Sequence, residues 1–310
     1  MSGTAAALQR PTASGSRLRA WLANPWRRPR LLALAGWGFV AWSLVPVAIA
    51  ILFSFNAGRS RSVWQGFSLR WYVQDPNLSV LHDPILAHAV LQSLKLASLT
   101  MLIATPVGVA LSIGLARWRG PASSASNFLM LLPLVTPEIV LASGLFLVFA
   151  HLYVLGGTRL FGTPAQLLGH VTWSIPYVVV VMRGRLFGIG KEYEEAAMDL
   201  GAPPMDAMRR VLLPLLAPAI FASFMIVFAL SIDDFITSQF LSSGEGSITL
   251  PMLIYGTGRT GENPSLNAVA TVMLVLSLSA IGIASVVLQR VARRRGTGET
   301  AARELVRFEI

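Results

Sequence analysis

Three carboxylic acids lie within or beside long apolar stretches of this sequence, where charged side chains are rare. Glu138 follows Pro137 inside one such stretch, and Asp233 and Asp234 close another. A carboxylate is costly to place in a bilayer, and those that occur there usually mark the path of an ion or a substrate. Adjacent residues of a helix point about 100° apart, so at most one of the two aspartates can face a pore squarely. These side chains are the first candidates for a transport function.

Each of them also has a purely structural alternative. Glu138, which lies at mid-span if its helix runs unbroken from Phe128, could accept a hydrogen bond from a neighbouring helix. The Asp pair follows Val211 by about 22 residues, or roughly 33 Å of helix, which places it at the outer surface of a bilayer. There the pair would be a solvated helix end, unless the span begins later and both residues move into its outer third.

A long polar segment, Glu192–Pro214, separates two of the apolar stretches. It predicts two short helices joined by a turn. The first has carboxylates in its first turn, where the helix dipole favours them, and ends at about Leu200. Gly201 suits the left-handed residue that ends a helix, and Pro204 suits the first position of the next one. Arg209 and the arginine after it fall near the end of that second helix, where cations are favoured. Such a folded, protruding element is suited to be held by a partner.

Motifs of common membrane and soluble enzymes are missing from the sequence. Around Gly190-Lys191 the phosphate-loop pattern fails, because Arg185 occupies its first glycine position and Glu192 its Ser/Thr position. The four histidines form no H-E-x-x-H pair, there is no G-x-S-x-G, and there is no cysteine. His170 is therefore expected to be a packed, hydrogen-bonded helix residue rather than a metal ligand. The chain is predicted to have no catalytic residues, and energy for transport would come from a separate subunit.

The composition indicates a membrane protein. Only 13% of the 310 residues are charged and the mean hydropathy is +0.62, whereas soluble domains carry about 25% charged residues. About 20 apolar residues cross a bilayer, and the first stretch exceeds the roughly 7–15 residues of a signal peptide's apolar region. The six predicted spans are 31–55, 90–116, 128–150, 165–182, 211–232 and 268–288. The fold class predicted is an all-α polytopic membrane protein with six transmembrane helices.

The remaining segments and their charges predict the orientation. We interpret 1–30 as a disordered basic tail, 56–87 as an outer loop with a short surface helix, and 289–310 as a second tail. With both termini in the cytoplasm, the inner segments hold 19 Lys and Arg residues and the outer loops hold five. Because positive charge gathers on the cytoplasmic side of membrane proteins, this orientation is favoured. The formal charge of +10 thus reports membrane topology, and no nucleic-acid partner is expected.

The polar segment also resembles a known motif. Glu195-Ala196-Ala197, then Gly201, then Val211-x-Leu213-Pro214 is similar to the EAA loop of ATP-binding-cassette (ABC) importer permeases of type I, in which an Ile commonly stands at the position of Val211. The resemblance implies that this loop faces the cytoplasm and docks onto an ATPase subunit, which would use the ATP and Mg, with no cofactor in this chain. The coupling residues so implied are Glu195, Ala196, Ala197, Leu200, Gly201, Val211 and Pro214.

A second resemblance covers most of residues 88–288. Ser231-Ile232-Asp233-Asp234-Phe235, Thr249-Leu250-Pro251-Met252 and the run from Asn263 to Thr271 are similar to the spermidine/putrescine importer permeases. The resemblance implies a polyamine substrate, for which fixed negative charge and aromatic faces make physical sense. Trp173 and Tyr177 are candidate faces, with packing as the alternative role of each. The pathway residues so predicted are Asp233, Asp234, Glu138, Trp173 and Tyr177.

The same resemblance implies partners and a location. They are a second permease subunit in a heterodimer, an ABC ATPase dimer, a periplasmic binding protein and the lipid of a bacterial inner membrane. Related permeases for iron(III), sulfate or phosphonate share the EAA loop, so those substrates stay open. A stand-alone secondary transporter is a further alternative, although the two halves of the chain are not alike, as they often are in such carriers. A non-transport scaffold is the last alternative, and it would leave the EAA spacing without a purpose.

The predicted topology can be tested with reporter fusions. Because the charge asymmetry places both termini inside, fusions after Arg119, Lys191 and Arg295 should report the cytoplasm. Fusions near Arg61, Gly157 and Glu245 should report the outside. A periplasmic signal after Lys191 would overturn the orientation and, with it, the cytoplasmic docking loop.

Overall fold

The computed structural model describes residues 30–60, 63–118, 120–156, 161–260 and 265–294, and these residues form helices and no strand. The chain divides into two units, residues 1–49 and 50–310. The helix α2 (Arg30–Ser54) begins in the first unit and is apolar on all sides, and Pro46 lies inside it. The predicted tail 1–30 lies almost wholly outside the described residues.

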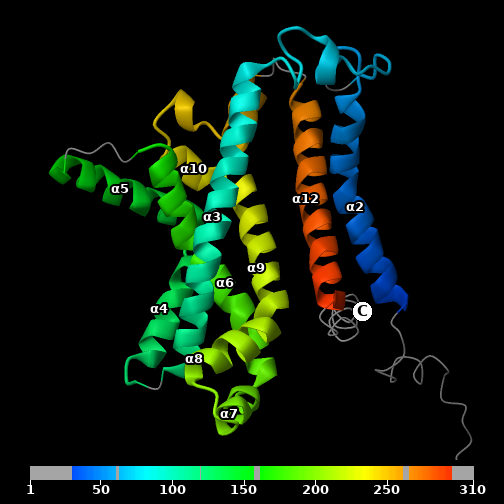
Figure 1. Ribbon diagram of the computed structural model, residues 1–310. Helices are drawn as coiled ribbons and strands as arrows, with labels where there is room; N and C mark the ends of the chain where they lie inside the picture. Colours follow the sequence, from blue (N-terminus) through cyan, green and yellow to red (C-terminus); the bar gives the residue numbers. More distant parts are fainter. Residues whose placement is uncertain (1–29, 61–62, 119, 157–160, 261–264, 295–310) are drawn as a thin grey trace, which may run out of the picture. The chain divides into compact units, whose positions relative to one another are not determined.

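Three long helices form the centre of the second unit. They are α3 (Pro84–Arg117), α6 (Thr163–Ile189) and α9 (Leu213–Asp233), and each packs against the other two (Figure 1). The Asp83 side chain caps α3 by accepting hydrogen bonds from the backbone N–H groups of its first turn. A Cβ at Gly108 would stand 2.6 Å from Cβ of Val178, so this glycine lets α3 approach α6 closely. The shared core is Ala104, Val109, Val178, Met182, Ile189, Leu212, Leu216, Ala219 and Val227.

The predicted third span, 128–150, is not one helix. It is broken into α4 (Ser123–Val135) and α5 (Glu138–Gly156), which meet at an angle of 106°, and α5 points away from the bundle (Figure 1). The condition that would put Glu138 at mid-span, a helix unbroken from Phe128, is not met, because proline disfavours helical backbone in the residue before it, and Thr136 before Pro137 is extended, with φ −70 and ψ 128. Glu138 therefore begins a helix, and it does not lie in the middle of one.

The other predicted spans each fall on a long helix. By length and composition five described helices could cross a membrane, and six if the bent pair counts as one span. The helices exceed the apolar stretches: α6 continues past Met182 to Ile189, and α12 (Leu266–Arg294) continues past Leu288. Part of the predicted tail 289–310 is therefore helix, and residues 295–310 lie outside the described part. These helices continue into polar residues because the backbone hydrogen bonds of a helix do not depend on the hydropathy of its side chains.

The polar segment folds mostly as predicted. α7 (Glu192–Asp199) ends at Leu200, and Gly201 has a φ of +88°, which confirms the left-handed turn. α8 (Pro204–Ala207) begins at the predicted proline. The second helix does not end near Arg209, as was predicted, but continues through a π-helical turn, Met208–Leu212, into α9. Pro214 has no backbone N–H, so one hydrogen bond to the preceding turn of the helix is missing. A π-helical turn can accommodate such an interruption.

The predicted outer loop holds one turn of π-helix, Arg70–Gln74, around a buried tryptophan. Trp71 is fully buried, and its indole N–H donates to the carbonyl of Asn56 at 2.7 Å. Asp75 accepts hydrogen bonds from the backbone N–H groups of Asn77 and Leu78 and from the Arg70 guanidinium. These bonds, that from Asn77 foremost, hold the pKa of Asp75 below its ordinary value, so the loop carries a fixed charge pair. The segment 235–264, also predicted to lie outside, forms α10 (Ile236–Phe240), a 3₁₀ turn Glu245–Ser247 and α11 (Leu250–Thr260) in its described part.

Because Gly201 is left-handed and Gly184 is helical, replacing each with alanine should affect transport differently. Gly201→Ala should cost about 1–2 kcal/mol locally, because left-handed backbone is unfavourable for residues with a Cβ, and it should misplace α7. Gly184→Ala is the control, since Gly184 is helical and a Cβ there meets nothing within 4 Å. Transport should fall for Gly201→Ala alone, with membrane insertion of both variants normal. Full transport by Gly201→Ala would show that the turn tolerates a side chain.

Candidate functional site

The two aspartates that close α9 lie in opposite environments. Asp233 is exposed, whereas Asp234 is only 7% exposed. Oδ2 of Asp234 accepts from the backbone N–H and the hydroxyl of Ser238, at 2.8 and 3.0 Å. Its Oδ1 accepts from the N–H of Thr237 at 3.4 Å. Asp234 thus holds α10 against the end of α9, while the Asp233 side chain remains available.

His170 of α6 completes the bonding of Asp234. Its Nε2 lies 3.0 Å from Oδ2 of Asp234 and 3.1 Å from Oγ of Ser238, and its Nδ1 lies 2.7 Å from Oγ of Ser231. A carboxylate can only accept, and the hydroxyl proton of Ser238 is already donated to Asp234. Nε2 must therefore carry a proton. This confirms the expectation that His170 is a packed, hydrogen-bonded residue.

A polar network continues from this histidine along α6. Gln166, fully buried one turn earlier, donates to the carbonyls of Ser238 and Ser247 at 3.0 and 2.8 Å. Its Oε1 accepts from Gln92 of α3 at 3.3 Å. Because buried polar groups need hydrogen-bond partners, this network specifies how α3, α6 and α10 meet.

A cavity of about 270 Å³ opens beside the α9–α10 corner. It lies between the α4–α5 break, the middle of α6 and the end of α9. The lining residues are Pro133, Leu134, Thr136, Glu138, Leu141, Trp173, Tyr177, Ala229, Leu230, Asp233 and Asp234. The structure therefore brings all five predicted pathway residues to one cavity, whatever their role there.

The cavity combines negative charge with aromatic walls. Glu138 and Asp233 are both exposed at it, and they come from different helices. Trp173 and Tyr177 lie one turn apart on α6, with ring centroids 6.0 Å apart and nearly perpendicular planes. A carboxylate pair beside aromatic faces can attract an organic cation through charge and through cation–π contacts.

A second cavity, of about 610 Å³, lies on the other side of Asp233. Apolar residues of α9, α11 and α12 make up most of its wall. Phe235 and Tyr255 also line it, with ring centroids 4.4 Å apart. Asp233 and Ala229 line both cavities.

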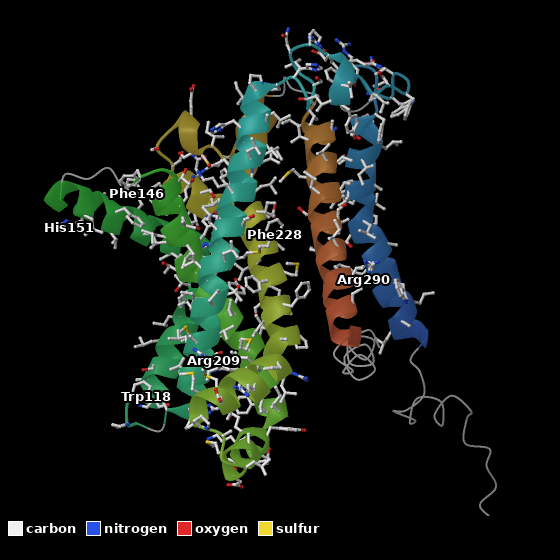
Figure 2. The ribbon with its side chains drawn as sticks, viewed as in Figure 1. Trp118, Phe146, His151, Arg209, Phe228 and Arg290 are labelled. Carbon is white, nitrogen blue, oxygen red and sulfur yellow. The ribbon has the colours of Figure 1, made fainter. Side chains whose placement is uncertain are left out.

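The predicted coupling residues lie at the far end of the bundle from α10 (Figure 1). Trp118 and Arg209 lie at this end too (Figure 2). Glu195 and Ala196 are exposed on α7, Ala197 is half-buried, and Leu200 is 91% exposed. Gly201 and Pro214 are exposed and Val211 is half-buried. None of these residues lines either cavity, so the two predicted sites are separate.

An ion pair that the sequence analysis did not identify anchors α7. Glu194 is only 4% exposed and pairs with Arg117 at the end of α3. The neighbouring Glu195 points outward and remains available to a partner. The signal in the sequence was weak, because three glutamates share the first turn of α7 and helical spacing alone does not say which of them is buried.

Other residues that the sequence analysis missed lie around the Asp234 corner. They are Gln92, Gln166, Ser231 and Ser238. Gln166 and His170 are spaced i, i+4 in α6, which places them on one face. That spacing could have indicated a polar contact, but its partners come from segments distant in sequence.

Comparison with known proteins agrees with this architecture. The profile of the family described as "Binding-protein-dependent transport system inner membrane component" matches residues 104–296. The putrescine transport system permease protein PotI of Escherichia coli is 36% identical over 84% of this chain and 88% of its own length. The spermidine/putrescine permease PotC of Haemophilus influenzae is 33% identical over 81% of this chain and 93% of its own. The fold matches that of a bacterial ABC transporter involved in alginate import, with a TM-score of 0.69 at 16% identity, covering 88% of this chain and 99% of that one.

The buried ion pair predicts that α7 opens when one partner is lost. Arg117→Ala leaves the Glu194 carboxylate buried without its partner, at a cost on the order of 1–3 kcal/mol. Cleavage by trypsin after the neighbouring Lys191 should therefore become several-fold faster, because proteolysis tracks local opening.

Two further variants test the specificity of this effect. Arg210→Ala should change cleavage little, because its pair with Asp206 is exposed and 3.5 Å long. The double exchange Arg117→Glu with Glu194→Arg should restore part of the protection. Equal cleavage of the parent and Arg117→Ala would mean that the pair does not hold α7.

Proposed function

The chain belongs to the family of binding-protein-dependent transport system inner membrane components, and we propose that it is the permease subunit of an ATP-driven importer for polyamines. It is a multi-pass protein of the inner membrane. Relatives named as permeases for putrescine and for spermidine/putrescine are 36% and 33% identical to this chain, and one named as a molybdenum permease is 31% identical. Membership in a family that works with binding proteins speaks against a stand-alone secondary transporter or a scaffold.

The observation that carries the substrate assignment is the acidic, aromatic cavity. It is lined by Glu138, Asp233 and Asp234, and no basic side chain is among the residues that line it in the described part of the chain. A polyamine carries positive charges separated by methylene groups, which suits carboxylates set among apolar and aromatic walls. A fixed charge at 4 Å from a partly desolvated cation contributes about 4 kcal/mol in an effective dielectric of 20, before desolvation is subtracted.

The alternative substrates fit this cavity less well. Sulfate and phosphonate are anions, and three carboxylates would repel them. Iron(III) would need a cluster of hard ligands, and no group of three or more His, Cys, Asp or Glu residues suited to a metal occurs in the part of the chain that the structure describes. The aromatic walls formed by Trp173 and Tyr177 also suit an organic ammonium better than a metal ion.

The partners proposed follow from the exposed end of α7. Tyr193 and Leu200 of this segment are 57% and 91% exposed beside the free carboxylate of Glu195. An apolar patch with a carboxylate is a suitable contact for a subunit that grips a helix, and we assign it to an ABC ATPase dimer, which would use the ATP and Mg. A second permease subunit and a periplasmic binding protein complete the proposed importer. The resemblance to polyamine permeases supports a heterodimer of permeases.

The two proposed sites should fail in different ways. Asp233→Asn keeps the shape of the side chain and deletes its charge, so putrescine uptake should fall about fivefold if a quarter of the 4 kcal/mol survives desolvation. Assembly with the ATPase and its basal activity should not change. Glu195→Ala should instead weaken ATPase binding or uncouple hydrolysis from uptake.

Glu245→Gln serves as the control for charge removal. Glu245 is exposed and lines neither cavity, so this variant should take up putrescine at the parent rate. Parent-rate uptake by Asp233→Asn as well would remove the physical support for a cationic cargo. The assignment to the permease family would survive that outcome, because it does not rest on Asp233.

A further inference from the structure

We propose that the two adjacent aspartates divide their work, with Asp233 contacting the cargo and Asp234 acting as a positioning residue that His170 holds in place. This inference rests on the proposed function, because it assigns roles within the polyamine pathway. It differs from treating the Asp pair as one cation site.

Most of the hydrogen bonds that Asp234 accepts come from α6 and α10, and at the first cavity its side chain meets that of Glu138. Oδ2 accepts from two groups of Ser238 and lies 3.0 Å from Nε2 of His170, and Oδ1 accepts from Thr237. A carboxylate that already accepts several hydrogen bonds gains little from a further cation, and the side chain is only 3% exposed. A cargo ammonium group would have to replace these bonds in order to bind Asp234 directly.

His170 is placed to lock the corner between α9 and α10. Its ring is fully buried, and its two nitrogens contact Ser231 on α9 on one side and Ser238 with Asp234 on the other. One side chain of α6 thus bonds to the chain both before and after the point where α9 ends. The adjacent Gly169 allows this approach, because a Cβ there would stand 2.6 Å from Cδ1 of Leu241.

The locked corner fixes the direction of Asp233. Asp233 is the last residue of α9 and directly precedes the anchored Asp234, so its backbone cannot rotate without breaking the bonds to His170. Its own carboxylate is exposed and lines both cavities. His170 also contacts Trp173 with ring centroids 5.6 Å apart, which connects the lock to the aromatic wall of the first cavity.

Thiol accessibility tests this division directly, since the natural chain contains no cysteine. In the assembled importer, Asp233→Cys should react quickly with a positively charged methanethiosulfonate, and putrescine should slow the reaction. Asp234→Cys should react at least tenfold more slowly, without protection by putrescine. Adding His170→Leu should speed the reaction of Asp234→Cys, because the corner is then released. Equal rates and equal protection at both positions would overturn the proposal.

The outcomes separate this inference from the proposed function. If putrescine protects neither cysteine, the polyamine assignment fails. The slow reaction of Asp234→Cys and its release by His170→Leu would then still support the lock. If Asp233→Cys is protected and His170→Leu has no effect at position 234, the lock fails and the cargo assignment stands.

A double-mutant cycle on putrescine uptake gives a second test that does not require a cysteine at position 234. His170→Leu and Asp234→Asn should each lower uptake about tenfold, and together no further, because both remove the same interaction. In the double variant of Asp233→Asn and His170→Leu, the fold-decrease in uptake should instead equal the product of the two single fold-decreases. Tenfold corresponds to about 1.4 kcal/mol of coupling. If the double variant of His170→Leu and Asp234→Asn loses uptake by the product of the two single fold-decreases, the proposal is contradicted.

Two further variants separate bonding from packing. His170→Gln places an amide N–H near the position of Nε2, so uptake should recover to within about threefold of the parent if a donor to the carboxylate is what matters. Thr172→Leu introduces the same leucine at an exposed position of the same helix and should be neutral. A His170→Gln variant as impaired as His170→Leu would show that the imidazole acts through its shape alone.

Discussion

Charge placed in apolar surroundings must find a partner, and that constraint organises this protein. The buried carboxylates of Asp234 and Glu194 are each paired with a side chain from another helix, His170 and Arg117. These two pairs fix the α9–α10 corner and the position of α7. Asp233 is the contrasting case, because it is exposed and lines two cavities. The distinction between a paired and an available carboxylate therefore separates the residues that build the site from those that can meet a cargo.

Local backbone features place these groups. Pro137 breaks the third span, and the break turns Glu138 from a mid-helix residue into the first residue of α5, facing the cavity. A helix N-terminus favours a carboxylate, so the break also lowers the cost of placing this acid there. Gly108 and Gly169 lack the Cβ atoms that would keep α6 away from α3 and from α10. The cavity thus depends on a proline that opens the chain and on glycines that let helices approach.

Much of the fold and part of the site could be predicted from the sequence, for identifiable reasons. The lengths of the apolar stretches predicted the long helices. Gly201, now seen to be left-handed, and Pro204 predicted the turn after α7. Hydropathy could not reveal the break at Pro137, because prolines also occur inside the continuous helices α3 and α6. The hydrogen-bond and ion-pair partners of His170 and Glu194 could not be predicted from the sequence either. They come from segments distant in sequence, and periodicity reports which face a residue occupies but not what it meets.

The connection between the two ends of the molecule follows from helix continuity. From Pro204 to Asp233 the chain is helical without interruption, through one π turn, so α8 cannot shift along its axis without moving the residue that precedes Asp234. α3 provides a second connection, because Arg117 holds α7 at one end and Gln92 bonds to Gln166 near the other. Packed helices resist bending and move as rigid bodies. A displacement of α7 would therefore reach the corner locked by His170 as a shift of whole helices, and it would change the space around Asp233 without breaking the bonds that hold Asp234.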